Sequence, residues 1–223
     1  MRTARIIFAF LLAAAGLAAP PRGSAQGTQA GERVADRIVA RIEGDIITLS
    51  DVRELSAFQQ LVEGKSESDD QLLSELIEQW VVNTEASATH FPKPPQTEVD
   101  RELARLQGQF KPPQAYAQRI AALGLSAEDV RDMLARQIYL ERYMDYKFRP
   151  TVQIDSAEVD KYYREELVPE LAKKGQPAPG ESGVEALIHE VLVQRAITKQ
   201  AAQWLDETKS HLKLVIVPAG DAK

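Results

Sequence analysis

Residues 37–52 constrain the fold of this chain more than any other stretch, because they predict a hairpin that runs directly into a helix. The side chains over 37–42 alternate with the two-residue period of a half-buried strand. A turn is expected at Gly44, which adopts a positive φ at little cost, and residues 46–48 then form a short return strand. Ser50 marks the expected helix start, since its hydroxyl can accept a hydrogen bond from an otherwise unpaired backbone N–H.

A two-stranded hairpin is only marginally stable in water, so a further strand or a packed helix has to complete it. The other β-rich run downstream of the hairpin is at 212–217, close to the C-terminus. We therefore expect the two ends of the chain to pair. The predicted fold class is mainly α, with a multi-helix body and a small antiparallel β-sheet formed by the N-terminal hairpin and the C-terminal strand.

The first 25 residues predict a cleavable export signal. Arg2 and Arg5 precede an apolar run over 6–19, and small residues at 23–25 suit cleavage after Ala25. The alternative is a membrane anchor, but the run is shorter than the roughly 20 residues that span a bilayer. Residues 26–33 then predict a flexible leader.

Charge and composition exclude several classes of function. Removing residues 1–25 takes away three arginines and no acid, so the formal charge falls from −6 to −9. Nucleic acid is therefore not an expected partner, because phosphate binding requires clustered Lys and Arg. The chain has no cysteine, which excludes disulfides, thiolate metal sites, a catalytic thiol and a lipid anchor on cysteine.

Between residues 52 and 167, apolar side chains recur at three- and four-residue steps, which predicts a series of helices. Two of the helix starts carry capping pairs, in which two side chains three residues apart satisfy free backbone N–H groups. These pairs are Ser126 with Asp129 and Asp155 with Glu158.

The C-terminal third predicts a loop followed by a long helix. Residues 169–183 are rich in Pro, Gly and charge, which favours a linker or an exposed loop. A helix is expected from Val184, and if it continues to His211 it is roughly 40 Å long. This helix would return the C-terminal strand to the hairpin.

An ordered series of segments resembles the N-terminal module of SurA-type periplasmic chaperones. The segments are ADRIVARIEGDIITLSDV, LIEQWVVNTEA, TEVDRELARL, the corner GLSAED, VQIDSAEVDKYYRE, and a long helix closed by HLKLVIV. The resemblance covers residues 34–217. It implies an N-terminal part of the module at 34–168, a loop or linker at 169–183, a long helix and strand at 184–217 that complete the module, and a tail at 218–223.

The resemblance also indicates what this chain lacks. Relatives usually carry a parvulin-type prolyl isomerase domain where residues 169–183 stand here, and about fifteen residues are too few for a domain. We therefore predict that the protein is not an enzyme, has no catalytic residues and no isomerase activity, and needs no cofactor.

Two further patterns in the sequence are of a kind that can bind metal ions or carry out acid–base chemistry, namely a His-Glu pair and two acidic pairs. His189-Glu190 begins like a zinc-binding HExxH motif, but Val193 occupies the position of the second His, so no metal site is predicted. The acidic pairs Asp69-Asp70 and Glu165-Glu166 are interpreted as solvated helix surface, and the alternative for the first pair is a calcium or acid–base site.

The resemblance implies a periplasmic, ATP-independent holdase for unfolded or nascent outer-membrane and exported proteins. Aromatic and Met side chains suit a groove for such clients, because they bury area without needing fixed partners. The alternative is that they are core residues, which aromatics at helical spacing commonly are. The candidate peptide-binding residues are Phe110, Tyr116, Met133, Tyr139, Tyr143, Met144, Tyr146 and Phe148.

A second hypothesis keeps the fold but changes the partner. In it the protein is a non-catalytic assembly or scaffold protein that binds one folded partner, or forms a homodimer by strand exchange, since a neighbour's strand can complete the hairpin equally well.

Overall fold

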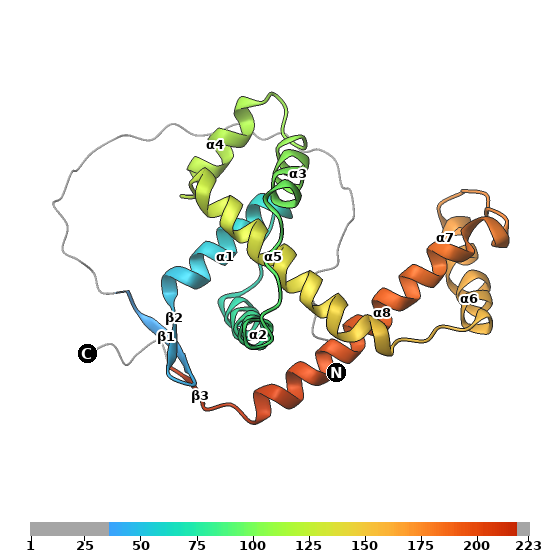
Figure 1. Cartoon of the computed structure of the whole chain (residues 1–223). Coiled ribbons are helices and arrows are strands. Elements are labelled where there is room, and N and C mark those ends of the chain that lie inside the picture. The colour runs from blue at the N-terminus through green and yellow to red at the C-terminus, as the bar shows by residue number, and fades with distance from the viewer. Residues whose placement is uncertain (1–35, 218–223) are drawn as a thin grey trace.

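The computed structural model describes residues 36–217 (Figure 1). The predicted signal peptide, leader and tail lie outside the described residues. The helices and strands, in chain order, are β1 (Ile38–Ile42), β2 (Asp45–Thr48), α1 (Leu49–Val62), α2 (Asp69–Ala88), α3 (Gln96–Gln107), α4 (Gln114–Ala122), α5 (Ala127–Phe148), η1 (Arg149–Thr151), α6 (Ser156–Tyr162), η2 (Tyr163–Leu167), α7 (Val168–Lys173), α8 (Glu181–Ser210) and β3 (Leu214–Ile216).

The three strands form one antiparallel sheet in the order β2-β1-β3, which confirms that the hairpin and the C-terminal strand pair. Ile42 lies opposite Asp45 on one side and Leu214 on the other. The expected alternation fails at one point, because the register shifts between Ile38 and Ala40 and Val39 is buried. A bulge of this kind turns an extra side chain towards the core.

The start of α1 differs from the prediction. Thr48, not Ser50, is the N-cap: its hydroxyl accepts from the Asp51 N–H, and the Asp51 carboxylate accepts from the Thr48 N–H at 2.7 Å. An N-cap needs extended backbone, and Thr48 has it as the last residue of β2 (φ −109°, ψ 166°). Ser50 is already inside the helix, and its N–H donates to Asp36 Oδ1.

Three apolar clusters hold the helices together, and α5 contributes to two of them. The first joins α1, α3, α4 and the N-terminal half of α5. The second joins α2, the C-terminal half of α5, and α8. The third seats the sheet on α1 and α2. In Figure 1, α5 crosses the molecule diagonally from α4 to α8, so it is the element that ties the helical body together.

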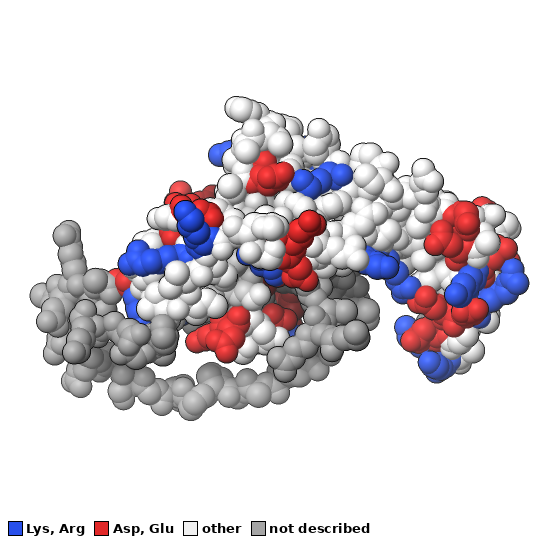
Figure 2. Space-filling view, turned by 90° about the horizontal axis from the view of Figure 1, so that it is seen from below, with Lys and Arg blue, Asp and Glu red and all other residues white. Residues whose placement is uncertain are grey.

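One end of α8 carries an arm made of α6, η2 and α7, which projects from the rest of the molecule (Figure 1). The prediction of a loop over 169–183 is wrong at both ends, because α7 continues to Lys173 and α8 begins at Glu181. Pro169 directly follows the π-helical turn η2, whose C-cap Val168 donates its N–H to the Tyr163 carbonyl five residues back, so the residue without an N–H stands where the regular helical hydrogen bonding is already interrupted. The arm displays charged side chains of both signs (Figure 2).

The long helix was correctly predicted and is longer than expected. It has 30 residues, about 45 Å at the usual rise. Arg195 on this helix contacts the arm twice, through an ion pair with Glu166 at 2.7 Å and through its guanidinium over the Tyr162 ring at 4.7 Å. These contacts hold η2 and α6 against α8.

Candidate functional site

A cleft of about 200 Å³ opens between α1, α2 and α5, next to the C-terminal half of α8. Its volume is below the roughly 300–1,000 Å³ of pockets that enclose small-molecule ligands, so it suits one or two side chains of a longer ligand. The apolar side chains that line it come from all four helices: Leu55, Phe58, Val62, Leu76, Val82, Met133, Leu140, Met144 and Leu205.

The same cleft is lined by six acidic side chains and one basic side chain, Arg136. The acids are Asp51, Glu54, Glu63, Glu75, Glu78 and Glu141. Because these carboxyl groups border an apolar surface, the cleft is amphipathic and has an excess of negative charge.

Glu75 is the most perturbed of these acids. Its carboxylate accepts hydrogen bonds from Gln59 Nε2 at 2.9 Å and from Gln79 Nε2 at 3.0 Å, both neutral amides. Gln59 is itself buried, and its Oε1 accepts from the Glu67 N–H at 3.0 Å, so its amide is held in place. Burial raises the pKa of Glu75 to about 7, because an ionised carboxylate loses hydration there.

Two further carboxyl groups share this environment. Burial raises the pKa of Glu141, whose Oε1 accepts from Gln137 Nε2 at 3.0 Å. Burial also raises the pKa of Glu54, although the positive charge of Arg136 opposes the shift. Three carboxyl groups with raised pKa values therefore line one cleft.

Glu78 is different, because a cation of the chain already pairs with it. Lys209 at the end of α8 donates to Glu78 Oε1 at 2.8 Å, and its ammonium also lies 3.2 Å from Asp206. This contact ties α8 to α2 beside the cleft.

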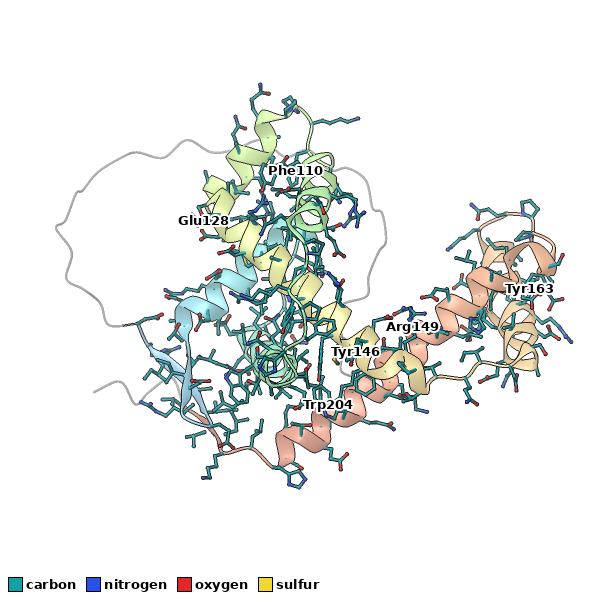
Figure 3. All side chains as sticks on the ribbon, in the orientation of Figure 1. Phe110, Glu128, Tyr146, Arg149, Tyr163 and Trp204 are labelled. Atoms are coloured by element: carbon teal, nitrogen blue, oxygen red, sulfur yellow. The ribbon has the colours of Figure 1, made fainter. Side chains whose placement is uncertain are left out.

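The predicted peptide-binding residues are divided between two places in the structure. Phe110, Tyr116 and Met133 belong to the first apolar cluster, where the rings of Phe110 and Tyr116 are 5.6 Å apart. The residues in the second cluster are Tyr139, Tyr143, Met144 and Phe148. Figure 3 shows Phe110 near α3 and Tyr146 on the half of α5 that lies towards α8, far from each other.

Of the predicted residues, Met133 and Met144 line the cleft. Tyr146 is 64% exposed, and its ring lies tilted against that of Phe91 with a centroid separation of 5.2 Å, beside a second, shallow hollow. Six of the eight predicted residues lie on the single helix α5, whereas the cleft is formed between three helices. One signal in the sequence does point to the cleft, namely Glu75 within the apolar stripe of α2 next to Leu76.

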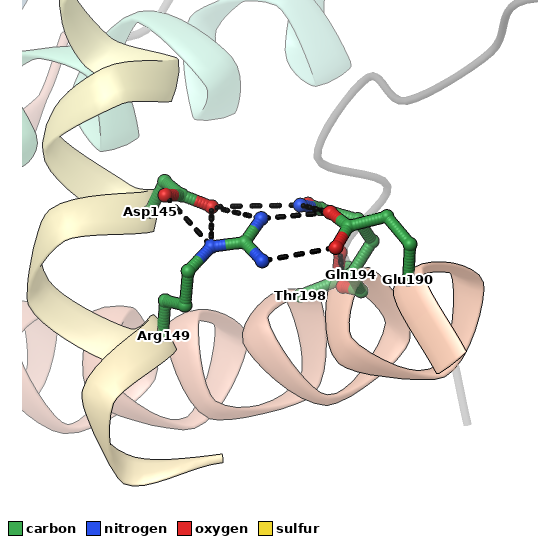
Figure 4. A network of polar contacts seen from close by, with 5 residues as sticks. All are labelled: Asp145, Arg149, Glu190, Gln194 and Thr198. Carbon is green, nitrogen blue, oxygen red and sulfur yellow. Dashed lines mark hydrogen bonds and ion pairs between the residues drawn. The ribbon is translucent and has the colours of Figure 1, made fainter. Parts of the chain in front are cut away.

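Glu190 of the His189-Glu190 pair belongs to a network of hydrogen bonds between α5 and α8. Arg149 donates two hydrogen bonds to Glu190, at 2.7 and 3.0 Å, and a further one to Asp145 Oδ1 at 2.8 Å (Figure 4). Gln194 Nε2 donates to Glu190 at 2.9 Å. These donors lower the pKa of Glu190 to about 2. The network joins the end of α5 to α8, and across residues 36–217 no group of three His, Cys, Asp or Glu side chains is arranged to hold a metal ion.

Comparison with known proteins gives no assignment. No model of a protein family matches the chain, and a search of curated proteins finds no significant match. Among the helices of the described part of the chain, none combines the length and apolar character needed to cross a bilayer.

Proposed function

We propose that this protein is an ATP-independent periplasmic chaperone that holds unfolded exported or outer-membrane polypeptides in the cleft between α1, α2 and α5. The observation that carries the proposal is the combination of an apolar lining with two adaptable methionines, Met133 and Met144, in a cleft too small for an enclosed small molecule. Resemblance of the sequence to the SurA-type module supports the same function, as does the predicted export signal.

The proposal is tested by light scattering. An unfolded outer-membrane β-barrel protein is diluted from urea with and without the purified chain, and the chain is expected to delay aggregation at a stoichiometric concentration. No ATP is added. Unchanged aggregation of several unrelated unfolded clients would contradict the proposal.

Matched variants connect the effect to the cleft. Val62→Ser and Leu140→Ser remove apolar surface from the cleft, while Val215→Ser and Leu187→Ser make the same changes at side chains that are 59% and 66% exposed elsewhere. The first pair is expected to weaken suppression of aggregation, and the second pair to leave it unchanged. Circular dichroism confirms that each variant is folded.

The exposed apolar side of the sheet favours a second candidate, an assembly protein that binds one folded partner or dimerises by strand exchange. Ile46 and Val215 flank Arg41 in neighbouring strands, and all three are exposed. Light scattering after gel filtration measures the mass of the protein in solution. Strand exchange predicts the mass of a dimer, and Val215→Ser is expected to weaken that dimer.

A further inference from the structure

The polar groups of the cleft indicate which unfolded segments it prefers. We propose that the cleft selects polypeptide segments in which a Lys or Arg lies between apolar side chains, with the cation paired with Glu75 or with Glu141. This inference rests on the proposed function and adds a charge preference to it.

The first argument is charge complementarity. The cleft is lined by six acids against one base, and Lys209 and Arg136 lie beside Glu78 and Glu54, respectively. The hydrogen bonds at Glu75 and Glu141 come from neutral amides of glutamines. Arg105, which is not in the lining of the cleft, places a positive charge near Glu141, and the negative charge of Glu102 opposes its effect. A cation of the client would therefore enter a site of negative potential, where charge-assisted hydrogen bonds are stronger than neutral ones.

The second argument is placement. Glu75 lies on α2 and Glu141 on α5, so the two carboxyl groups belong to different walls of the cleft. Apolar side chains on these walls include Leu76, Leu140 and Met144. The methylene stem of a Lys or Arg can pack on such surface while its charged end reaches a carboxylate, and neighbouring apolar residues of the client add further contact.

The third argument is desolvation. Burial raises the pKa values of both carboxyl groups, which means that their ionised forms lack part of the hydration that water would supply. A bound ammonium or guanidinium stabilises the ionised form and compensates for that loss. An acidic client segment would instead add like charge, so the cleft is expected to reject it.

A metal ion is a poorer occupant. Within residues 36–217, the acidic side chains do not converge in groups of three that could hold a cation, and two of them are already bonded to glutamine amides. A flexible side chain with an apolar stem matches the mixed lining better than a bare ion does.

Fluorescence anisotropy with three labelled peptides tests the proposal. The peptides share the sequence Gly-Ser-Leu-Phe-X-Leu-Phe-Ser-Gly, with Lys, Met or Glu at X. At low salt and pH 8 we expect the Lys peptide to bind several-fold tighter than the Met peptide and about tenfold tighter than the Glu peptide. Raising the salt concentration should reduce these differences.

Variants then assign the preference to the two carboxyl groups. Glu75→Gln with Glu141→Gln is expected to weaken binding of the Lys peptide about five- to tenfold, and to leave the Met peptide within about twofold. Glu165→Gln with Glu170→Gln makes the same chemical change at exposed positions on the arm and should alter neither affinity.

The outcomes separate this inference from the function on which it rests. If the Met peptide binds as tightly as the Lys peptide, or if the Lys preference persists in the double variant, the charge selection is overturned while the chaperone proposal stands. If none of the peptides binds and aggregation of unfolded clients is unaffected, both fail. The comparison of three peptides on the unaltered chain does not depend on the folding of any variant.

Discussion

Glu43 and Lys213, which are 170 residues apart in the chain, are joined by two hydrogen bonds. The Lys213 N–H donates to Glu43 Oε1 at 2.8 Å, and the Glu43 N–H donates to the Lys213 carbonyl at 3.3 Å. Glu43 lies in the hairpin turn with φ +48°, followed by Gly44 with φ +103°. Two successive positive φ values suit the right-handed twist of a hairpin, so the turn that shapes β1 and β2 also receives β3.

Removing the Glu43 carboxylate should therefore weaken the closure of the sheet. Glu43→Ala is expected to lower the free energy of unfolding by about 0.5–1.5 kcal/mol, because the Lys213 N–H loses its side-chain acceptor. Glu43→Gln retains an acceptor oxygen and should stay close to the unaltered protein. Urea denaturation measures both, and equal losses in the two variants would contradict the role given to this hydrogen bond.

The inner side of β3 should matter more than its outer side. Leu214 packs against the cluster that seats the sheet, whereas Val215 on the same strand is exposed. Leu214→Ala is expected to cost about 1–3 kcal/mol and Val215→Ala less than about 0.5 kcal/mol. Thermal or urea unfolding is the measurement, and a similar cost at both positions would argue against the observed register.

Glu75 should make stability depend on pH. Its pKa is about 7 in the folded chain, against an ordinary value of 4.5. Between these values the folded state binds a proton that the unfolded state does not. The favourable contribution of Glu75 protonation to the free energy of unfolding is therefore complete below pH 4.5, and it is lost as the pH rises through 7.

Glu75→Gln removes that dependence, since Gln does not titrate. The variant is expected to be more stable than the unaltered protein at pH 8 by on the order of 1–2 kcal/mol, with a smaller difference at pH 5. Urea denaturation of both proteins at several pH values between 5 and 8 measures this difference in the free energy of unfolding. Parallel pH profiles would show that Glu75 does not titrate in this range.

The Arg149 network should depend on the shape of the guanidinium as well as on its charge. Arg149→Lys keeps the charge but cannot form the paired hydrogen bonds to Glu190, so a loss of about 0.5–1 kcal/mol is expected. Arg164→Lys is the control, because its ion pair with Asp160 is more exposed and joins residues of one turn. Chemical denaturation measures the free energy of unfolding of both variants. Equal losses for Arg149→Lys and Arg164→Lys would contradict a stabilising role of the Arg149 network.

We also predict that the purified chain does not catalyse prolyl isomerisation. SurA-type proteins, which the sequence resembles, usually carry a parvulin domain where this chain has residues 169–183, and here that segment holds the end of the short helix α7 and the start of α8. The cis–trans rate of a Pro-containing tetrapeptide should stay at its uncatalysed value with the protein present. An increase in rate proportional to protein concentration would refute the prediction.

Local structure could be read from the sequence wherever neighbouring residues supply all the interactions. Ser126 with Asp129 and Asp155 with Glu158 form the predicted capping boxes, because each requires only side chains three residues apart. The loop predicted over 169–183 is helical over 169–173 and from Glu181 onwards, and long-range contacts such as the ion pair of Glu166 with Arg195 hold this arm.

The amino-acid sequence by itself determined the small sheet, since residues 37–48 and 212–217 are its β-rich segments and a hairpin needs a third strand. Tertiary structure alone decided which apolar side chains are core and which line the cleft. Tyr143 and Met144 are neighbours on α5 and both are buried, yet Met144 borders the cleft and Tyr143 does not. Helical periodicity specifies the direction in which a side chain points from the axis of its helix. A cleft depends instead on the distances between three separate helices.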